Sequence, residues 1–111
     1  MLPRSQRLSA EQFALVMKNG RVSHSPLFML RALSGSADMR VSTTVPVKIA
    51  KTAVQRNKFR RKLYEAVRLI VSNIVFNTHI AIIAKPQLLQ SDQKVIEMEV
   101  RDAFVKAKLL R

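Results

Sequence analysis

The sequence contains no cysteine and no tryptophan, only two glycines, and only seven acidic residues among its 111. The lack of cysteine excludes disulfides, zinc–thiolate sites and a thiol nucleophile, and it fits a reducing cytoplasm, where we expect the protein to reside. Two glycines cannot form a glycine-rich loop for nucleotide phosphates. The apolar runs are too short to cross a bilayer and the N-terminal residues lack the pattern of a signal peptide, so we expect no membrane-spanning segment.

Basic residues, in contrast, are abundant: 20 Lys and Arg against 7 Asp and Glu give a formal net charge of +13. Residues 48–68, KIAKTAVQRNKFRRKLYEAVR, hold eight Lys or Arg and one acid, a local charge of +7. A crowded, ordered cationic surface repels itself and favours a polyanionic partner. Composition favours nucleic acid as that partner, with an anionic membrane surface second, and we expect no membrane among the partners.

The pattern of apolar residues predicts a single α+β domain over residues 1–111, an α/β sandwich with the order α-β-β-(β)-α-β-α. A first helix is expected from Ser9, which begins a capping-box pattern, to about Asn19, with Gly20 as its stop. The next 27 residues, 21–47, are predicted to be extended. A turn-type loop of hairpin length separates the two strands expected there, Leu27–Leu33 and Met39–Val47.

In the second of these strands apolar and polar residues alternate, which indicates a sheet with one covered and one open face. A second helix is expected to start at Thr52 and to continue to about Asn73. Its predicted apolar stripe consists of Phe59, Leu63, Ala66, Val67, Ile70 and Ile74. A buried strand at His79–Ala84 and a final helix over about residues 91–110, with Phe104 on its inner side, complete the expected order.

The predicted second helix carries the residues best suited to bind phosphate. Arg56 and Arg60 are one turn apart, as are Asn57 and Arg61, so charged groups lie side by side. An arginine fork grips two phosphate oxygens or stacks on a base, and Asn57 between cations can read a 2′-hydroxyl or a base edge. Tyr64 fits either base stacking or a hydrogen-bonded place on the helix surface. The alternative of a merely solvated helix would normally intersperse acids, and this helix has one.

An open sheet face can form the floor of a groove for single-stranded nucleic acid, with bases stacked on aromatic side chains. Phe13 on the first helix is a candidate for such stacking and, alternatively, for packing its helix onto the core. Catalytic patterns are sparse: His24 and His79 have no cysteine or carboxylate at metal-ligand spacing, and His79 is expected to be structural. We therefore expect no catalytic residue and no metal site in the protein alone.

The stretch AVQRNKFRRKLYEAVR, Ala53–Arg68, resembles the bacterial ribonuclease P protein subunit. That family carries an Arg-Asn-Arg signature followed by further basic residues on its central helix. Here Arg56 and Asn57 match the signature, Lys58 stands at its third position, and Arg60 and Arg61 match the basic pair. The resemblance extends to RLSAEQFALVMKNG near the N-terminus, to the strand HIAIIAKP and to the final helix, and so covers nearly the whole chain.

The resemblance implies a ribonucleoprotein endonuclease that removes the 5′ leader from precursor tRNA, a tRNA-processing step. Its RNA subunit performs the hydrolysis with Mg²⁺, and the protein is a non-catalytic subunit that binds ribonuclease P RNA and precursor tRNA. It also implies an uncommon left-handed βαβ crossover. The implied RNA-binding residues are Lys48, Lys51, Arg56, Asn57, Lys58, Arg60, Arg61, Tyr64 and Arg68. Phe13 and Met17 would line the leader cleft.

Some positions depart from the family pattern. Met17 stands where many members have a second aromatic residue, although methionine still packs softly on a base. Lys58 keeps the positive charge but lacks the bidentate fork of arginine, and Val47 replaces a polar position. The alternative function is that of a ribosomal or general RNA-binding protein with a similar small α+β fold. A stand-alone nuclease is a further alternative.

Overall fold

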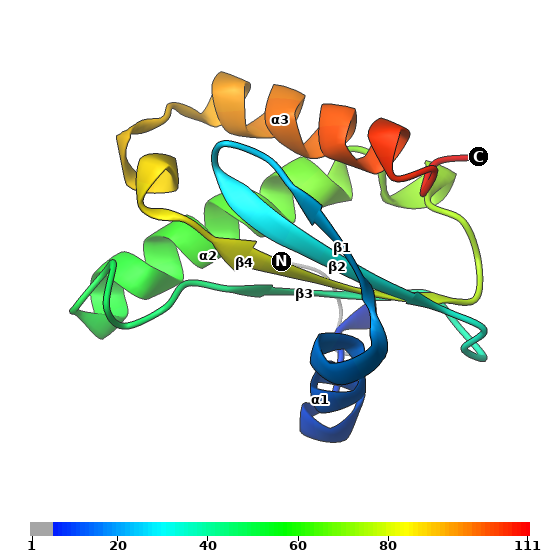
Figure 1. Ribbon diagram of the computed structural model, residues 1–111. Helices are drawn as coiled ribbons and strands as arrows, with labels where there is room; N and C mark the ends of the chain where they lie inside the picture. The colour runs from blue at the N-terminus through cyan, green and yellow to red at the C-terminus, as the bar shows by residue number, and fades with distance from the viewer. Residues whose placement is uncertain (1–5) are drawn as a thin grey trace.

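The computed structural model describes residues 6–111 and has the predicted α+β architecture (Figure 1). The helices are α1 (Ala10–Asn19), α2 (Ala53–Arg68) and α3 (Gln93–Lys106), with short 3-10 turns at Val71–Asn73 and Pro86–Gln90. The strands are β1 (Arg21–His24), β2 (Phe28–Ser34), β3 (Arg40–Thr44) and β4 (Thr78–Ala84). The predicted starts of α1 and α2 are confirmed. The side chains of Ser9 and Thr52 accept hydrogen bonds from backbone N–H groups in the first turns of these helices.

The four strands form one mixed sheet in the order β1-β2-β4-β3. β1 and β4 each pair antiparallel with β2, whereas β3 pairs parallel with β4. The turn-type loop therefore joins two strands that are not neighbours, because β4 lies between β2 and β3. β4, THIAIIA, is almost continuously apolar and buried, and a strand of this kind occupies a central position with both faces covered. The N–H groups of Gly35 and Ser36 instead donate to the carbonyl oxygen of Asn77, just before β4.

Two helices cover one face of the sheet and one helix covers the other (Figure 1). The apolar stripe predicted for the second helix is buried and packs with α3 and the sheet in one core cluster, although Ile70 and Ile74 lie beyond the end of α2. Phe28 of β2 and Phe104 of α3 are fully buried in this core, as expected. Each such side chain stabilises the fold by about 1.5–3 kcal/mol through burial. The connection β3-α2-β4 is a βαβ unit, and its left-handed crossover stays a prediction.

α1 packs on the opposite face of the sheet, against β2 and β4, through the fully buried Val16. Gly20 ends α1 as predicted, and its N–H donates to the carbonyl oxygen of Val16 at 2.8 Å. Its backbone is extended rather than left-handed, with φ −73°. A Cβ atom at Gly20 would lie 2.5 Å from the Val16 oxygen and 3.3 Å from the backbone of Ala32. Glycine is therefore required here because a Cβ atom would clash with the last turn of α1 and crowd the backbone of β2.

Three predicted boundaries extend too far. The final helix ends at Lys106 instead of about Leu110, and Lys108 just beyond it has a left-handed backbone with φ 59°. The second helix ends at Arg68 instead of about Asn73, because the chain tightens into a 3-10 turn and Ile74 then bridges to Leu110. The strand predicted through Val47 ends at Thr44, and Val47 is 63% exposed. Pro46 lies between them and cannot donate to a strand ladder, so the chain leaves the sheet.

Candidate nucleic-acid interface

The first turn of α2 is fixed at both its backbone and its first arginine. Thr52 Oγ1 accepts a hydrogen bond from the N–H of Gln55 at 3.2 Å, and Arg56 Nη1 donates to the carbonyl oxygen of Ala50 at 2.9 Å. These contacts hold the loop that precedes α2 against the helix. The basic residues of α2 therefore lie on an ordered helix rather than on a flexible tail.

One flank of α2 faces the edge strand β3. Arg56, Asn57 and Arg60 line a hollow of about 230 Å³ together with Thr43 and Thr44 of β3. Arg60 Nη2 donates to Asn57 Oδ1 at 2.8 Å, so the asparagine orients the guanidinium. Three residues of the predicted RNA-binding set are thus brought together at the sheet edge.

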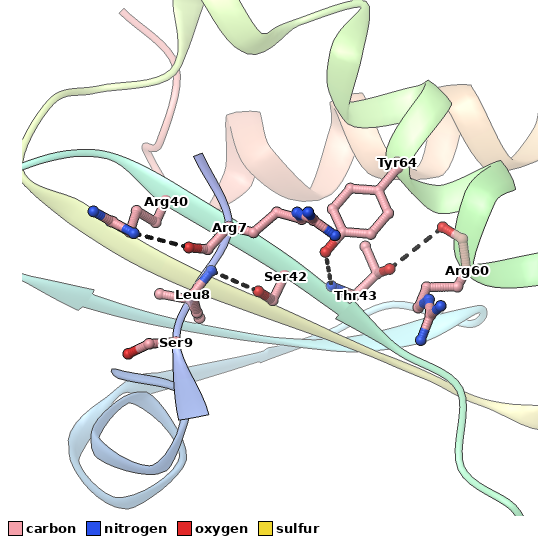
Figure 2. Close-up of a pocket in the computed structure, with 8 residues that line it drawn as sticks. All are labelled: Arg7, Leu8, Ser9, Arg40, Ser42, Thr43, Arg60 and Tyr64. Carbon is pink, nitrogen blue, oxygen red and sulfur yellow. Dashed lines mark hydrogen bonds between the residues drawn. The ribbon is translucent and has the colours of Figure 1, made fainter. Parts of the chain in front are cut away.

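A second hollow continues along β3 past Arg60 and measures about 580 Å³ (Figure 2). Its lining is Arg7, Leu8, Ser9, Arg40, Ser42, Thr43, Arg60 and Tyr64. Arg60 and Thr43 belong to both hollows, and we call the two together the β3-edge surface. Arg7 and Arg40 were not among the predicted site residues, because they precede the basic helix in sequence and only the fold brings them to it.

Tyr64 is 4% exposed, and its hydroxyl accepts a hydrogen bond from the Thr43 N–H at 3.3 Å. The Thr43 hydroxyl in turn donates to the carbonyl oxygen of Arg60 at 3.3 Å. Of the two alternatives left open by sequence, the structure has the hydrogen-bonded one. A base cannot stack on this buried ring, so the predicted contact of Tyr64 with RNA is limited to its hydroxyl.

The remaining predicted cations lie elsewhere on or near α2. Lys58 is about 160° around the helix from Arg60. Its Nζ lies 5.7 Å from the centre of the Phe59 ring, and Lys62 Nζ lies 5.2 Å from the same ring on that flank. Lys58 is therefore separated from the β3-edge surface. The other predicted cations, Lys48, Lys51, Arg61 and Arg68, are exposed.

Few of these cations are neutralised by the protein itself. Arg68 forms an ion pair with Glu65 at 2.9 Å, which lowers the pKa of the glutamate and raises that of the arginine. Within residues 6–111, the other α2 cations have no carboxylate within ion-pair distance. Among the described residues, the acids of the protein therefore leave most of the α2 cations available to a polyanion.

The predicted leader-cleft residues, Phe13 and Met17, are half-buried on α1. The Met17 carbonyl oxygen accepts a hydrogen bond from Arg31 Nη1 at 2.8 Å, which ties α1 to β2. Beyond α1, a hollow of about 370 Å³ lies against side chains that include Met29 and Ile83 of the sheet. The role of Phe13 and Met17 in binding a leader stays a prediction.

A charged cluster not foreseen from sequence lies at the start of β3. Asp38 Oδ1 lies 2.9 Å from Nε2 of His79, 41 residues away, and Asp38 Oδ2 accepts from Arg40 Nε at 2.9 Å. The hydrogen bond with His79, followed by that with Arg40, lowers the pKa of Asp38 below its ordinary value. Arg40 Nη1 also donates to the carbonyl oxygen of Arg7 at 3.1 Å. The cluster therefore fastens the segment before α1 to β3.

Metal ligands do not gather in the described part of the chain: residues 6–111 contain no group of three or more His, Cys, Asp or Glu side chains placed to hold an ion. Nor does any helix in that range have the length and apolar character needed to cross a bilayer.

The sequence is similar to those of proteins from a known family. A profile of the family described as Ribonuclease P matches residues 2–108. The ribonuclease P protein component of Brevibacillus brevis is 32% identical over 111 residues, covering 97% of this chain and 87% of that protein. That of Xanthomonas campestris is 31% identical over 110 residues, covering 98% of this chain and 70% of its own.

Solved structures share the fold. The Staphylococcus aureus RNase P protein superposes with a TM-score of 0.84 at 21% identity, covering 96% of this chain and 98% of that one. The Thermotoga maritima RNase P protein gives a TM-score of 0.76 at 22% identity, covering 86% and 92%. With the profile match spanning nearly the whole sequence, the chain belongs to the family of bacterial ribonuclease P protein components.

Proposed function

We propose that this protein binds the RNA subunit of ribonuclease P through α2 and the β3-edge surface, and thereby supports 5′ maturation of precursor tRNA. Membership of the family gives it a subunit role in tRNA processing. The observation that carries the proposal is the set of cations on the ordered helix α2, of which only Arg68 pairs with a carboxylate among residues 6–111. Exposed like charges on one helix destabilise it, and bound phosphate groups relieve that repulsion.

In this proposal the holoenzyme is an endoribonuclease whose RNA cuts the substrate with Mg²⁺, and the protein is a non-catalytic subunit. We assign the magnesium ions to the RNA, since the described residues of the protein assemble no set of ligands for them. The protein contributes by screening phosphate repulsion and by positioning the substrate. A cytoplasmic location is part of the same proposal.

The 5′ leader of precursor tRNA is proposed to lie along the open part of the sheet beside α1. Phe13 and Met17 on α1 are half-buried and keep part of their side chains accessible to a base. Lys48 and Lys85 border the hollow that continues from this face, so a phosphate backbone would meet positive charge there. Stacking on aromatic or thioether groups beside cations is the usual mode of binding single strands.

The test is reconstitution with a bacterial ribonuclease P RNA at low magnesium, using precursor tRNA with and without a 5′ leader. We expect the protein to lower the magnesium concentration needed for cleavage and to tighten binding of the substrate that carries a leader. A general RNA-binding protein would stabilise the RNA without distinguishing the two substrates. Cleavage by the protein without RNA would refute the division of labour and favour a stand-alone nuclease.

A further inference from the structure

Seven of the eight residues that line the larger hollow of the β3-edge surface carry a hydrogen-bond donor in the side chain. Three arginines from three parts of the chain reach it: Arg7 before α1, Arg40 on β3 and Arg60 on α2 (Figure 2). No Asp or Glu is among its lining residues. The acid nearest in the hydrogen-bond network, Asp38, is bound to Arg40 and to His79. The hollow therefore keeps an excess of positive charge.

Two of the arginines that line this hollow have a buried side-chain nitrogen without a hydrogen-bond acceptor in the described part of the chain. Residues 6–111 contain three buried side-chain nitrogens without a hydrogen-bond partner, and two of them are Nε of Arg7 and Nε of Arg60. Buried donors of this kind are rare in folded proteins, and each needs a partner such as an ordered water or an ion. Both arginines line the same hollow, so two unsatisfied donors lie around one cavity.

The hydroxyl groups of Tyr64 and Ser42 are further donors in the same hollow. Tyr64 accepts a hydrogen bond from Thr43, and Ser42 Oγ accepts one from the N–H of Leu8 at 2.8 Å. Each hydroxyl still has its own proton, and the structure provides neither proton with an acceptor within residues 6–111. Arg40 is paired with Asp38, whereas Arg7 and Arg60 have no carboxylate partner among residues 6–111. Their guanidinium groups and the two hydroxyl protons are donors of the kind that bind the oxygens of a phosphate group.

We infer that this hollow, which we call the three-arginine pocket, binds one phosphodiester group of an RNA backbone. Its volume of about 580 Å³ far exceeds a single phosphate group and falls within the range of about 300–1,000 Å³ typical of ligand sites. The pocket has room for the sugars on either side of the phosphate, which favours a nucleic-acid strand over a free ion. The inference rests on the proposed RNA partner and adds a specific site to it.

Occupation of the three-arginine pocket would connect three elements. Arg7 belongs to the segment leading into α1, and Ser9, also in the lining, is the N-cap of α1. Arg60 belongs to α2, and Ser42 to β3. A phosphate held by all three parts would clamp the start of α1 against α2. The pocket thus links the helix proposed to bind RNA with the helix proposed to line the leader cleft.

The test compares Arg7→Gln with Arg21→Gln in the full chain. Arg21 is exposed on β1 and offers the same change of charge away from the pocket. The fold should survive Arg7→Gln, because the side chain donates no Nε hydrogen bond and the backbone oxygen that Arg40 uses remains. Two readouts are needed: amide NMR shifts on titration with inorganic phosphate, and affinity for ribonuclease P RNA across salt concentrations.

For the wild type we expect phosphate to shift the amides of Leu8, Ser42 and Thr43, and Arg7→Gln to abolish these shifts. Arg7→Gln should also weaken RNA binding about tenfold and reduce the salt slope by about 1, as expected for loss of one phosphate contact. Arg21→Gln should change neither readout. Arg7→Lys, which keeps the charge without the fork, should recover part of the affinity.

Other outcomes overturn the inference in distinguishable ways. Phosphate shifts scattered over α2, or absent, would mean that the pocket is not a phosphate site. Phosphate binding with unchanged RNA affinity in Arg7→Gln would mean a site for an adventitious ion only. In both cases Arg61→Gln, which removes an exposed α2 cation outside the pocket, tests the proposed function separately. Failure of that variant to weaken RNA binding would count against the α2 interface itself.

Discussion

The salt dependence of RNA binding follows directly from the number of cations that can reach phosphate. The set used for this count is Arg7, Lys48, Lys51, Arg56, Arg60 and Arg61. If each neutralises one phosphate, the slope of log affinity against log salt is about −5, from −0.9 per contact. Affinity should then fall on the order of a thousandfold between 50 and 200 mM salt.

The perturbation is the double change Lys51→Gln and Arg61→Gln. Both side chains are exposed, and neither forms a hydrogen bond or ion pair within the described residues, so folding stability should not change. Loss of two contacts lowers the slope to about −4 and the fall over the same salt range to on the order of a hundredfold. The assay is filter binding of ribonuclease P RNA at several salt concentrations.

The matched control is Arg21→Gln with Arg101→Gln, which removes two exposed positive charges from β1 and α3. Because net charge changes equally, any effect of overall charge appears in both variants. We expect the slope to change only in the variant that lacks Lys51 and Arg61. Equal slopes in the two variants would show that RNA responds to net charge and that α2 is not the interface.

Three further predictions concern stability. Gly20→Ala should lower the free energy of unfolding by about 1–3 kcal/mol through overpacking, because the new Cβ would lie 2.5 Å from a carbonyl oxygen of α1. Chemical denaturation measures this loss, and an unchanged midpoint would contradict the clash. Tyr64→Phe should lower the free energy of unfolding by about 1–3 kcal/mol, since it leaves the buried N–H of Thr43 without a hydrogen-bond partner. Thermal melts measure this loss, and an unchanged Tm would show that water replaces the tyrosine hydroxyl. The hydrogen bond from His79, and then that from Arg40, lowers the pKa of Asp38, so its contribution to stability is present above the ordinary value of 3.8 and is lost as pH falls through the lower folded value. The Tm difference between wild type and Asp38→Asn should therefore shrink in acid, and a difference that grows instead would reverse the assigned sign.

Local patterns in the sequence predicted most of the elements. The stripe that includes Phe59, Leu63 and Val67 has the helical period, and Ser9 and Thr52 cap helices by contacts within three residues. Such features depend on neighbours along the chain, so sequence alone was sufficient to find them. The basic residues of α2 were found for the same reason, since their charges are contiguous in sequence.

The features that sequence could not predict depend on long-range pairing. Strand order needs to be known before β4 can be placed between β2 and β3, and no local signal in the turn-type loop revealed it. Asp38 and His79 are 41 residues apart, and Arg7 reaches α2 only through the fold. The burial of Tyr64 was likewise hidden, because its partner Thr43 lies on a strand 21 residues earlier.

The contact between Tyr64 and Thr43 has a consequence for how copies of this protein meet in solution. β3 is an outermost strand, and outermost strands with open backbone groups recruit strands from other molecules and seed aggregation. Here a tyrosine hydroxyl already occupies one such backbone group, and the guanidinium of Arg60 stands beside it. Two copies approaching rim to rim would bring like charges together. The positive charge along the outer side of β3, which favours binding of a polyanion, thus also disfavours polymerisation of the protein in the absence of its partner.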